Sequence, residues 1–180
     1  LQNLTLPLPV SLPFEVGELQ VHGATPLALG PVRGHYRYDH TTGHQLRLDE
    51  LNLAQGRYSG DVTLAGTAPM NLQAQLQGEL QLPQWKEQTL LARATLSGSL
   101  AGADARLQLQ GTLEPTRPLR RGPAAPEATV AAELWPWAAQ PVHRADVKVS
   151  HLDLSALWPG APRTHHTATL QATPLPQRQS

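Results

Sequence analysis

A strict alternation of apolar and polar residues between positions 70 and 82 constrains the fold of this chain more than any other feature. Every second position is apolar or small, and every position between them is Asn, Gln or Glu. A helix repeats its apolar side every ~3.6 residues, so a period of two separates the two kinds of side chain only in an extended chain. The segment therefore predicts a long β-strand whose apolar face carries Met70, Leu72, Ala74, Leu76, Gly78, Leu80 and Leu82.

The same alternation returns along most of the 180 residues, and no helical pattern of comparable length competes with it. We expect antiparallel β-repeats over residues 1–114, a loop or linker rich in Pro and Arg over 115–127, further β-repeats over 128–172 and a tail over 173–180. A single helical turn is expected at residues 155–158, where Pro159 and Gly160 end it. The alternation changes phase at Gly17, which is how a β-bulge looks in sequence, and another slip of phase precedes Leu51.

The composition narrows the class of protein. Aromatic residues make up only 4% of the chain, so burial depends on Leu, Ala and Val. The formal net charge is zero, and we therefore expect no binding to nucleic acid. Cysteine is absent, which excludes disulfides and thiolate sites. No apolar run approaches the ~20 residues of a membrane-spanning helix.

The chain starts at Leu1, without an initiator methionine and without the basic and apolar regions of a signal peptide. This start predicts a processed product or an excised fragment. Any anchor or targeting segment is then expected to lie outside the sequence.

The residue types that usually carry catalysis or metal binding form no recognisable motif. His35, His40 and His44 surround one predicted hairpin, and His165 is followed by His166, but none has the His-x-x-x-His spacing of a helical metal site. There is no Gly-x-Ser-x-Gly turn, no Walker sequence and no carboxylate pair. The four tryptophans fall beside prolines or in predicted loops, where we expect them to cover a sheet end rather than to stack on a ligand. We therefore predict neither an enzyme nor a protein with a metal or another cofactor.

A large apolar sheet face needs something to cover it, and three arrangements provide a cover. In a β-sandwich a second sheet packs about 10 Å away. In a transmembrane barrel the apolar face meets lipid, but such barrels have aromatic girdles, which this chain lacks. In a curled trough the inner face is occupied by acyl chains. The alternation alone leaves the sandwich and the trough open.

Three segments share a texture of degenerate strand repeats: residues 70–80 (Met-Asn-Leu-Gln-Ala-Gln-Leu-Gln-Gly-Glu-Leu), residues 94–100 (Ala-Thr-Leu-Ser-Gly-Ser-Leu) and residues 149–164 (Val-Ser-His-Leu-Asp-Leu-Ser-Ala-Leu-Trp-Pro-Gly-Ala-Pro-Arg-Thr). In this texture the chain resembles the TamB (translocation and assembly module subunit) and AsmA-like family of diderm bacteria, over the region from Pro13 to Ala172. The resemblance implies an all-β fold, an elongated and curled antiparallel sheet that forms a U-shaped, β-taco-like trough with a hydrophobic groove. A β-sandwich is the alternative.

The resemblance also implies a function and a location. The chain would be a middle segment of a hydrophobic conduit that carries phospholipid between the inner and outer membrane, in the periplasmic part of an inner-membrane-anchored protein. Its partners would be phospholipid acyl chains and, through regions outside this segment, an outer-membrane barrel of the Omp85 type. The alternative function is a β-rich binding module that assists the assembly of outer-membrane proteins or autotransporters by strand pairing.

A lipid conduit needs apolar area and no reactive group, so the missing catalytic motifs agree with this expectation. Under this hypothesis the apolar positions of successive strands line the groove. The residues expected there are Leu46, Leu48, Val62, Leu64, Met70, Leu72, Ala74, Leu76, Leu80, Leu82, Leu90, Ala92, Leu96, Leu107, Leu109, Val130, Leu134, Val147 and Val149.

Overall fold

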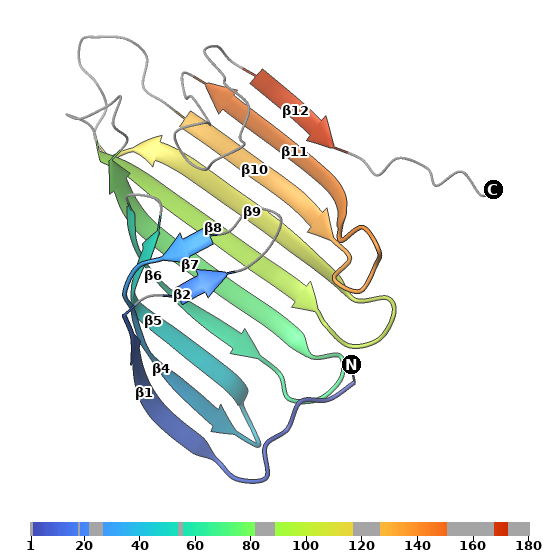
Figure 1. The fold of residues 1–180 in the computed structure, drawn as a ribbon. Coiled ribbons are helices and arrows are strands. Elements are labelled where there is room, and N and C mark those ends of the chain that lie inside the picture. The colour runs from blue at the N-terminus through green and yellow to red at the C-terminus, as the bar shows by residue number, and fades with distance from the viewer. Residues whose placement is uncertain are drawn as a thin grey trace.

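The computed structural model describes residues 2–17, 19–21, 27–53, 56–81, 89–116, 127–150 and 168–172. These residues form strands, turns and bends, and none of them lies in a helix. No helix that is long and apolar enough to cross a membrane occurs among them. Ten strands form one antiparallel sheet, and two short strands form a separate hairpin (Figure 1).

The strands of the large sheet follow one another in almost simple order. Each strand from β5 onward pairs with the strand before it in the sequence, and β1 pairs with β4 because the hairpin of β2 (Leu19–Val21) and β3 (Leu27–Leu29) is inserted between them. The bounds are β1 (Val10–Val16), β4 (Val32–Asp39), β5 (Gly43–Leu53), β6 (Gly56–Leu64), β7 (Asn71–Gln81), β8 (Thr89–Ser99), β9 (Arg106–Pro115), β10 (Glu127–Leu134), β11 (Val142–Ser150) and β12 (Ala168–Ala172).

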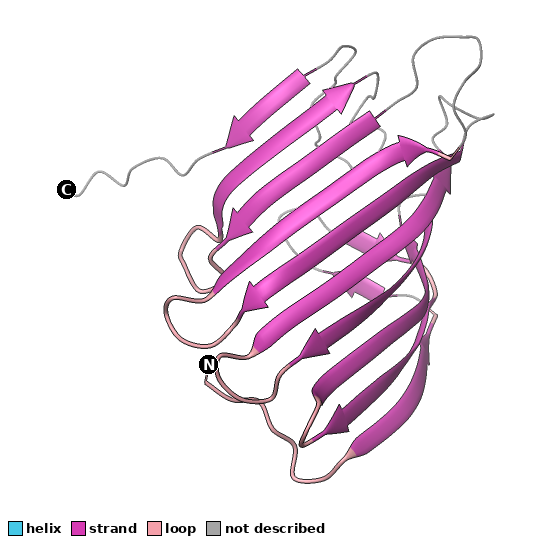
Figure 2. Cartoon of the chain, turned by 180° about the vertical axis from the view of Figure 1, so that it is seen from behind, coloured by secondary structure: helices cyan, strands magenta, loops and turns pink. Residues whose placement is uncertain are grey.

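The sheet is open, twisted and weakly curved (Figures 1 and 2). Strands β1 and β12 are its two edges. The prediction of an all-β fold built on one curled antiparallel sheet is confirmed, although the curl is gentler than a deep U-shaped trough. A second sheet of the kind that a β-sandwich requires is not found in the part of the chain that the structure describes, where only the β2–β3 hairpin lies beside one face (Figures 1 and 2).

The region predicted as a linker connects two neighbouring strands. Strand β9 ends at Pro115 and β10 begins at Glu127, and these two strands pair along their length. The β-repeats on either side of residues 115–127 therefore belong to the same sheet. Residues 117–126, the predicted helical turn at 155–158 and the predicted tail at 173–180 lie outside the described residues.

Two predicted strand details are wrong for local reasons. Met70 is not the first residue of the long strand, because its φ of 54° places it in the left-handed region, in the turn before β7. Gly17 is not a bulge inside a strand. Strand β1 ends at Val16, and the next strand belongs to the other sheet.

The second predicted change of phase is a bulge in the structure. The pairing of β5 with β6 shifts register between Leu48 and Leu51, and the pairing of β4 with β5 shifts at the same place. The extra residue lets Leu48 and Leu51 lie on the same face although their spacing is odd. The apolar face of the sheet therefore continues across β5 without interruption.

The turns at one end of the strands are joined to one another by hydrogen bonds. The Leu4 N–H donates to the Gly66 carbonyl at 2.8 Å, and the Leu100 N–H donates to the Met70 carbonyl at 3.1 Å. The indole Nε1–H of Trp137 donates to the Leu100 carbonyl at 2.8 Å. These bonds connect the N-terminal segment with the turns after β6, β8 and β10, so the turn backbones at this end satisfy one another.

Candidate functional site

The register of the sheet places nearly all its apolar side chains on one face. Residues directly opposite each other on paired strands lie on the same side. One row that crosses the sheet contains Phe14, Gly34, Leu48, Gly60, Leu76, Ala94, Gly111, Val130 and Val147, and we call it the central row. The neighbouring row contains Val16, Val32, Leu51, Tyr58, Gly78, Ala92, Leu113, Ala128 and Val149.

An apolar groove of about 340 Å³ follows these two rows from β6 to β11. The five strand spacings between β6 and β11 correspond to a length of about 24 Å. We call this feature the apolar groove. The lining residues with side chains on the apolar face are Tyr58, Leu80, Ala92, Ala94, Gly111, Leu113, Ala128, Val130, Val147 and Val149.

Small residues create the groove. Gly111 and Ala94 lie opposite each other in the central row, and Ala92 lies beside them in the next row. A Cβ atom on Gly111 would approach Cγ1 of Val130 to 2.8 Å, so Val130 packs where a side chain at position 111 would otherwise lie. Larger residues surround this floor, which leaves a shallow channel perpendicular to the strands.

Burial along the strands separates the ends of the apolar face from its middle. Leu80, Leu90, Leu113 and Val149 form a buried cluster at one end of their strands, with Leu90 and Val149 fully buried. The central positions, such as Val130, are only partly buried. This cluster therefore stabilises the sheet and forms the buried side of the groove, and the central row provides apolar surface that a ligand can cover.

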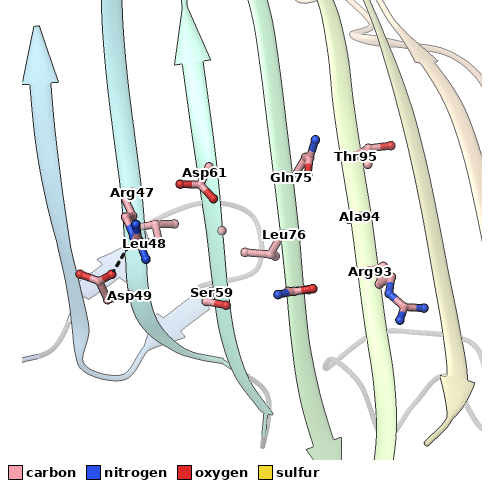
Figure 3. Close-up of a pocket in the computed structure, with 12 residues that line it drawn as sticks. Arg47, Leu48, Asp49, Ser59, Asp61, Gln75, Leu76, Arg93, Ala94 and Thr95 are labelled. Atoms are coloured by element: carbon pink, nitrogen blue, oxygen red, sulfur yellow. Dashed lines mark hydrogen bonds and ion pairs between the residues drawn. The ribbon is translucent and has the colours of Figure 1, made fainter.

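The opposite face has a polar cleft of about 460 Å³ over β5, β6, β7 and β8 (Figure 3). Its side chains are largely exposed and pair with one another or with neighbours. Arg47 Nε lies 3.1 Å from a carboxylate oxygen of Asp49, and Arg93 donates to Glu114 at 2.6 Å. We consider this cleft a solvated surface, because a binding site is usually a concave, largely apolar pocket with few fixed polar groups.

The pKa of Glu50 on the polar face is lowered by its neighbours. The side-chain amide of Asn52 donates to Glu50 at 3.1 Å, and Arg33 donates to the other carboxylate oxygen. These hydrogen bonds, with Asn52 as the larger cause, lower the pKa of Glu50. Arg57 adds a weaker attraction at 3.7 Å.

The histidines of the first predicted hairpin take separate structural roles. His44 is buried, and its Nε2 lies 2.8 Å from the Leu4 carbonyl. A carbonyl only accepts, so Nε2 donates this hydrogen bond, and Nδ1 pairs with the Tyr36 hydroxyl at 2.6 Å. His35 bonds to Ser11 on the opposite face. Groups of three or more His, Asp or Glu side chains arranged for a metal ion are not found among the described residues.

Trp135 lies in the predicted loop and makes three contacts with neighbouring side chains. Its ring stacks on His143 with centroids 3.9 Å apart, and the Arg106 guanidinium lies 4.3 Å from the ring centroid. Its indole N–H donates to Glu133 at 3.0 Å. These contacts fasten the turn between β10 and β11 to the sheet. Trp85 and Trp158 lie outside the described residues.

The register brings the predicted groove residues together on one face, with two exceptions. Met70 is fully buried in the turn before β7, and Leu82 lies outside the described residues. The others share the apolar face, and Leu80, Ala92, Val130, Val147 and Val149 line the apolar groove directly. Their proposed role in holding lipid stays a prediction.

Sequence reasoning missed the floor of the groove. Ala94, Gly111 and Ala128 have the same alternation phase as the predicted lining residues of their strands, but they were not counted as lining. Tyr58 and Leu113 were also missed, although their phase places them on the apolar face. Counting every second residue of each strand, whatever its size, would have found all five.

Comparison of the chain with family models, with curated proteins and with solved structures gave no match.

Proposed function

We propose that this chain is a segment of a periplasm-spanning hydrophobic conduit, in which the apolar groove holds phospholipid acyl chains on their way between the inner and outer membrane of a diderm bacterium. One observation carries the proposal. The groove crosses the strands from β6 to β11, and the side chains that line it on this face are aliphatic apart from Tyr58. A hydrocarbon chain makes no directional demand, so such a lining suits it better than it suits a polar ligand.

The free energy of burying an acyl chain suits a conduit that both binds and releases phospholipid. Burial of each CH₂ group contributes about 0.8 kcal/mol, so a few methylenes give appreciable binding. Because the lining repeats similar side chains from strand to strand, a chain that slides along the groove exchanges one set of contacts for an equivalent one. The volume of about 340 Å³ is at the lower end for ligand pockets, which favours one hydrocarbon chain at a time.

A second candidate function is strand pairing with an unfolded outer-membrane protein. The two open edges of the described sheet, β1 and β12, favour it. However, β1 has Pro13 in its middle, and proline has no N–H to donate to an added strand. The groove is therefore the stronger argument.

The test is to load the purified chain from vesicles of phosphatidylethanolamine and phosphatidylglycerol, separate it from the vesicles and measure extracted phospholipid by mass spectrometry. We expect bound phospholipid on the native chain. Val130→Asp places a carboxylate in the groove, whose desolvation should lower loading at least about ten-fold. The control is Thr129→Asp, because its side chain lies on the polar face opposite Lys148.

Two outcomes would reject the conduit. Native protein that carries no phospholipid would reject it directly. Equal loading of Val130→Asp and the control, both folded by circular dichroism, would show that lipid binds elsewhere. If, in addition, the native chain bound a hydrophobic strand peptide along its edge, the strand-pairing function would replace the conduit.

A further inference from the structure

Tyr58 lies flat on the apolar face at one end of the groove. It is opposite Gly78 in the register, and a Cβ on Gly78 would lie 2.4 Å from Cδ1 of the Tyr58 ring. A Cβ on Gly56 would lie 2.7 Å from the Tyr58 hydroxyl oxygen. The ring therefore covers two glycines, an aromatic side chain filling the space that glycine leaves on a sheet. It forms the end wall of the groove at β6.

The hydroxyl of Tyr58 is the one polar side-chain group that the described lining offers on the apolar face. Arg93, Thr112 and Thr129 also border the groove, but the register places their side chains on the opposite face. No hydrogen bond of the Tyr58 hydroxyl is found within the described residues. Burial raises the pKa of Tyr58, so the hydroxyl keeps its proton and remains a donor.

The groove thus has two different ends. The β6 end has a neutral donor, and among the described lining residues those of β7 to β11 offer only aliphatic side chains and glycine on this face. A single neutral donor suits a neutral acceptor. A phosphate would need a cation, and the arginine and lysine side chains of β8 to β11 lie on the opposite face.

We infer that Tyr58 sets the position and direction of the bound lipid, by donating a hydrogen bond to an ester carbonyl of a phospholipid whose acyl chain then lies across β7 to β11. This inference rests on the proposed function. Within the described lining, Tyr58 is then the one residue that can form a hydrogen bond with a lipid that slides along the groove. The headgroup phosphate then lies outside the groove.

The test uses the 180-residue chain loaded with phosphatidylcholine that carries a nitroxide on the acyl chain, either next to the ester or at the methyl end. Paramagnetic broadening of backbone amide signals then reports which strands lie near each label. We expect the label next to the ester to broaden amides of β6 and β7, and the label at the methyl end to broaden those of β10 and β11.

Tyr58→Phe keeps the ring and removes only the hydroxyl. Loss of one hydrogen bond should lower lipid affinity about five-fold, and both labels should then broaden both ends of the groove similarly. Ser59→Ala is the matched control, since it removes a hydroxyl from the next residue on the polar face. It should leave affinity and broadening unchanged.

The outcomes separate this inference from the proposed function. If neither label broadens any amide of the apolar face, lipid does not bind there and both proposals fail. If both labels broaden the apolar face but the native pattern is reversed or without direction, the conduit stands and the role of Tyr58 is rejected. An unchanged pattern in folded Tyr58→Phe rejects that role as well.

Discussion

The two faces of the ten-stranded sheet are built from the same strands, yet they use their side chains in opposite ways. On the polar face, arginines and carboxylates form ion pairs that remain exposed, such as Arg47 with Asp49 and Arg93 with Glu114. On the apolar face, side chains are buried at the strand ends and partly open in the middle. Alternation with a period of two lets one strand serve both purposes at once.

This difference indicates where stability and function reside. Exposed ion pairs contribute at most about 1 kcal/mol each, because water screens them. Burial of a whole leucine side chain contributes about 1.5–3 kcal/mol, so the apolar face dominates the free energy of unfolding. Its central row is nevertheless left half open, and that unused apolar surface is what the proposed ligand would cover.

The sharpest test of the comparison is a pair of adjacent leucines on opposite faces. Leu90 is fully buried in the apolar cluster, whereas Leu91 lies on the polar face between Glu79 and Glu114. Leu90→Ala should lower the free energy of unfolding by about 2–5 kcal/mol, because it removes buried methyl groups and leaves a cavity. Leu91→Ala should cost less than about 1 kcal/mol.

Urea denaturation followed by far-ultraviolet circular dichroism measures both variants. Similar losses in Leu90→Ala and Leu91→Ala would mean that the two faces contribute equally. The assignment of stability to the apolar face would then be wrong.

The second test concerns the polar pair of Tyr36 and the buried His44 on the apolar face. Tyr36→Phe removes the hydroxyl that pairs with Nδ1 of His44, which leaves a polar atom of a buried ring unsatisfied and should cost about 1–3 kcal/mol. Arg93→Gln breaks an ion pair on the polar face and should cost at most about 1 kcal/mol. Urea midpoints compare the stability of the two variants. A larger loss of stability in Arg93→Gln than in Tyr36→Phe would contradict the conclusion that the apolar face contributes more to stability.

Much of this fold is predictable from sequence because alternation fixes the face of each side chain. A change of phase before Leu51 was predicted from the sequence, and the structure shows it as a bulge in β5, since one face must stay apolar. Gly17 gave the same local signal and proved to end a strand. A change of phase does not say whether the next residues pair with the same neighbour, which only the whole sheet determines.

The groove was predictable in its chemistry but not in its position. The predicted leucines and valines lie on the expected face, but the channel itself follows Ala94 and Gly111, which meet only through the register of β8 with β9. Met70 continued the alternation in sequence, but the turn before β7 rotates it out of the strand. Depth on a sheet surface depends on neighbours across strands, and a single strand pattern does not contain them.

A third test narrows the groove without adding charge. Gly111→Ala places a methyl group 2.8 Å from Cγ1 of Val130, so the valine must shift into the groove. The bound acyl chain then loses contact over about one methylene, which contributes ~0.8 kcal/mol of binding free energy. Phospholipid loading should fall about four-fold, with little change in the free energy of unfolding. Gly17→Ala is the control, because a Cβ there meets nothing within 4 Å. Equal loading of the two variants would place the lipid away from the groove.

The smallest expected effect is the pH dependence on the polar face. The pKa of Glu50 lies below its usual value of 4.5 in the folded state, because Asn52 and then Arg33 donate hydrogen bonds to the carboxylate. The unfolded chain therefore binds the proton first as pH falls, so the stability that Glu50 contributes is complete above pH 4.5 and is lost as pH falls through the lower folded-state pKa.

Glu50→Gln should reduce the loss of stability below pH 4.5, and it should lower the free energy of unfolding slightly at neutral pH. Asn52→Ala should do the same in part, since it removes the larger of the two causes. Because the Arg33 and Arg57 side chains are exposed, added salt should reduce their attraction to Glu50, and with it the difference between native protein and Glu50→Gln. Urea midpoints measured from neutral pH to below 4.5 check the sign. An identical acid slope in native protein and Glu50→Gln would show that even the best-connected carboxylate of the polar face adds nothing to stability, and that the apolar face alone holds the sheet.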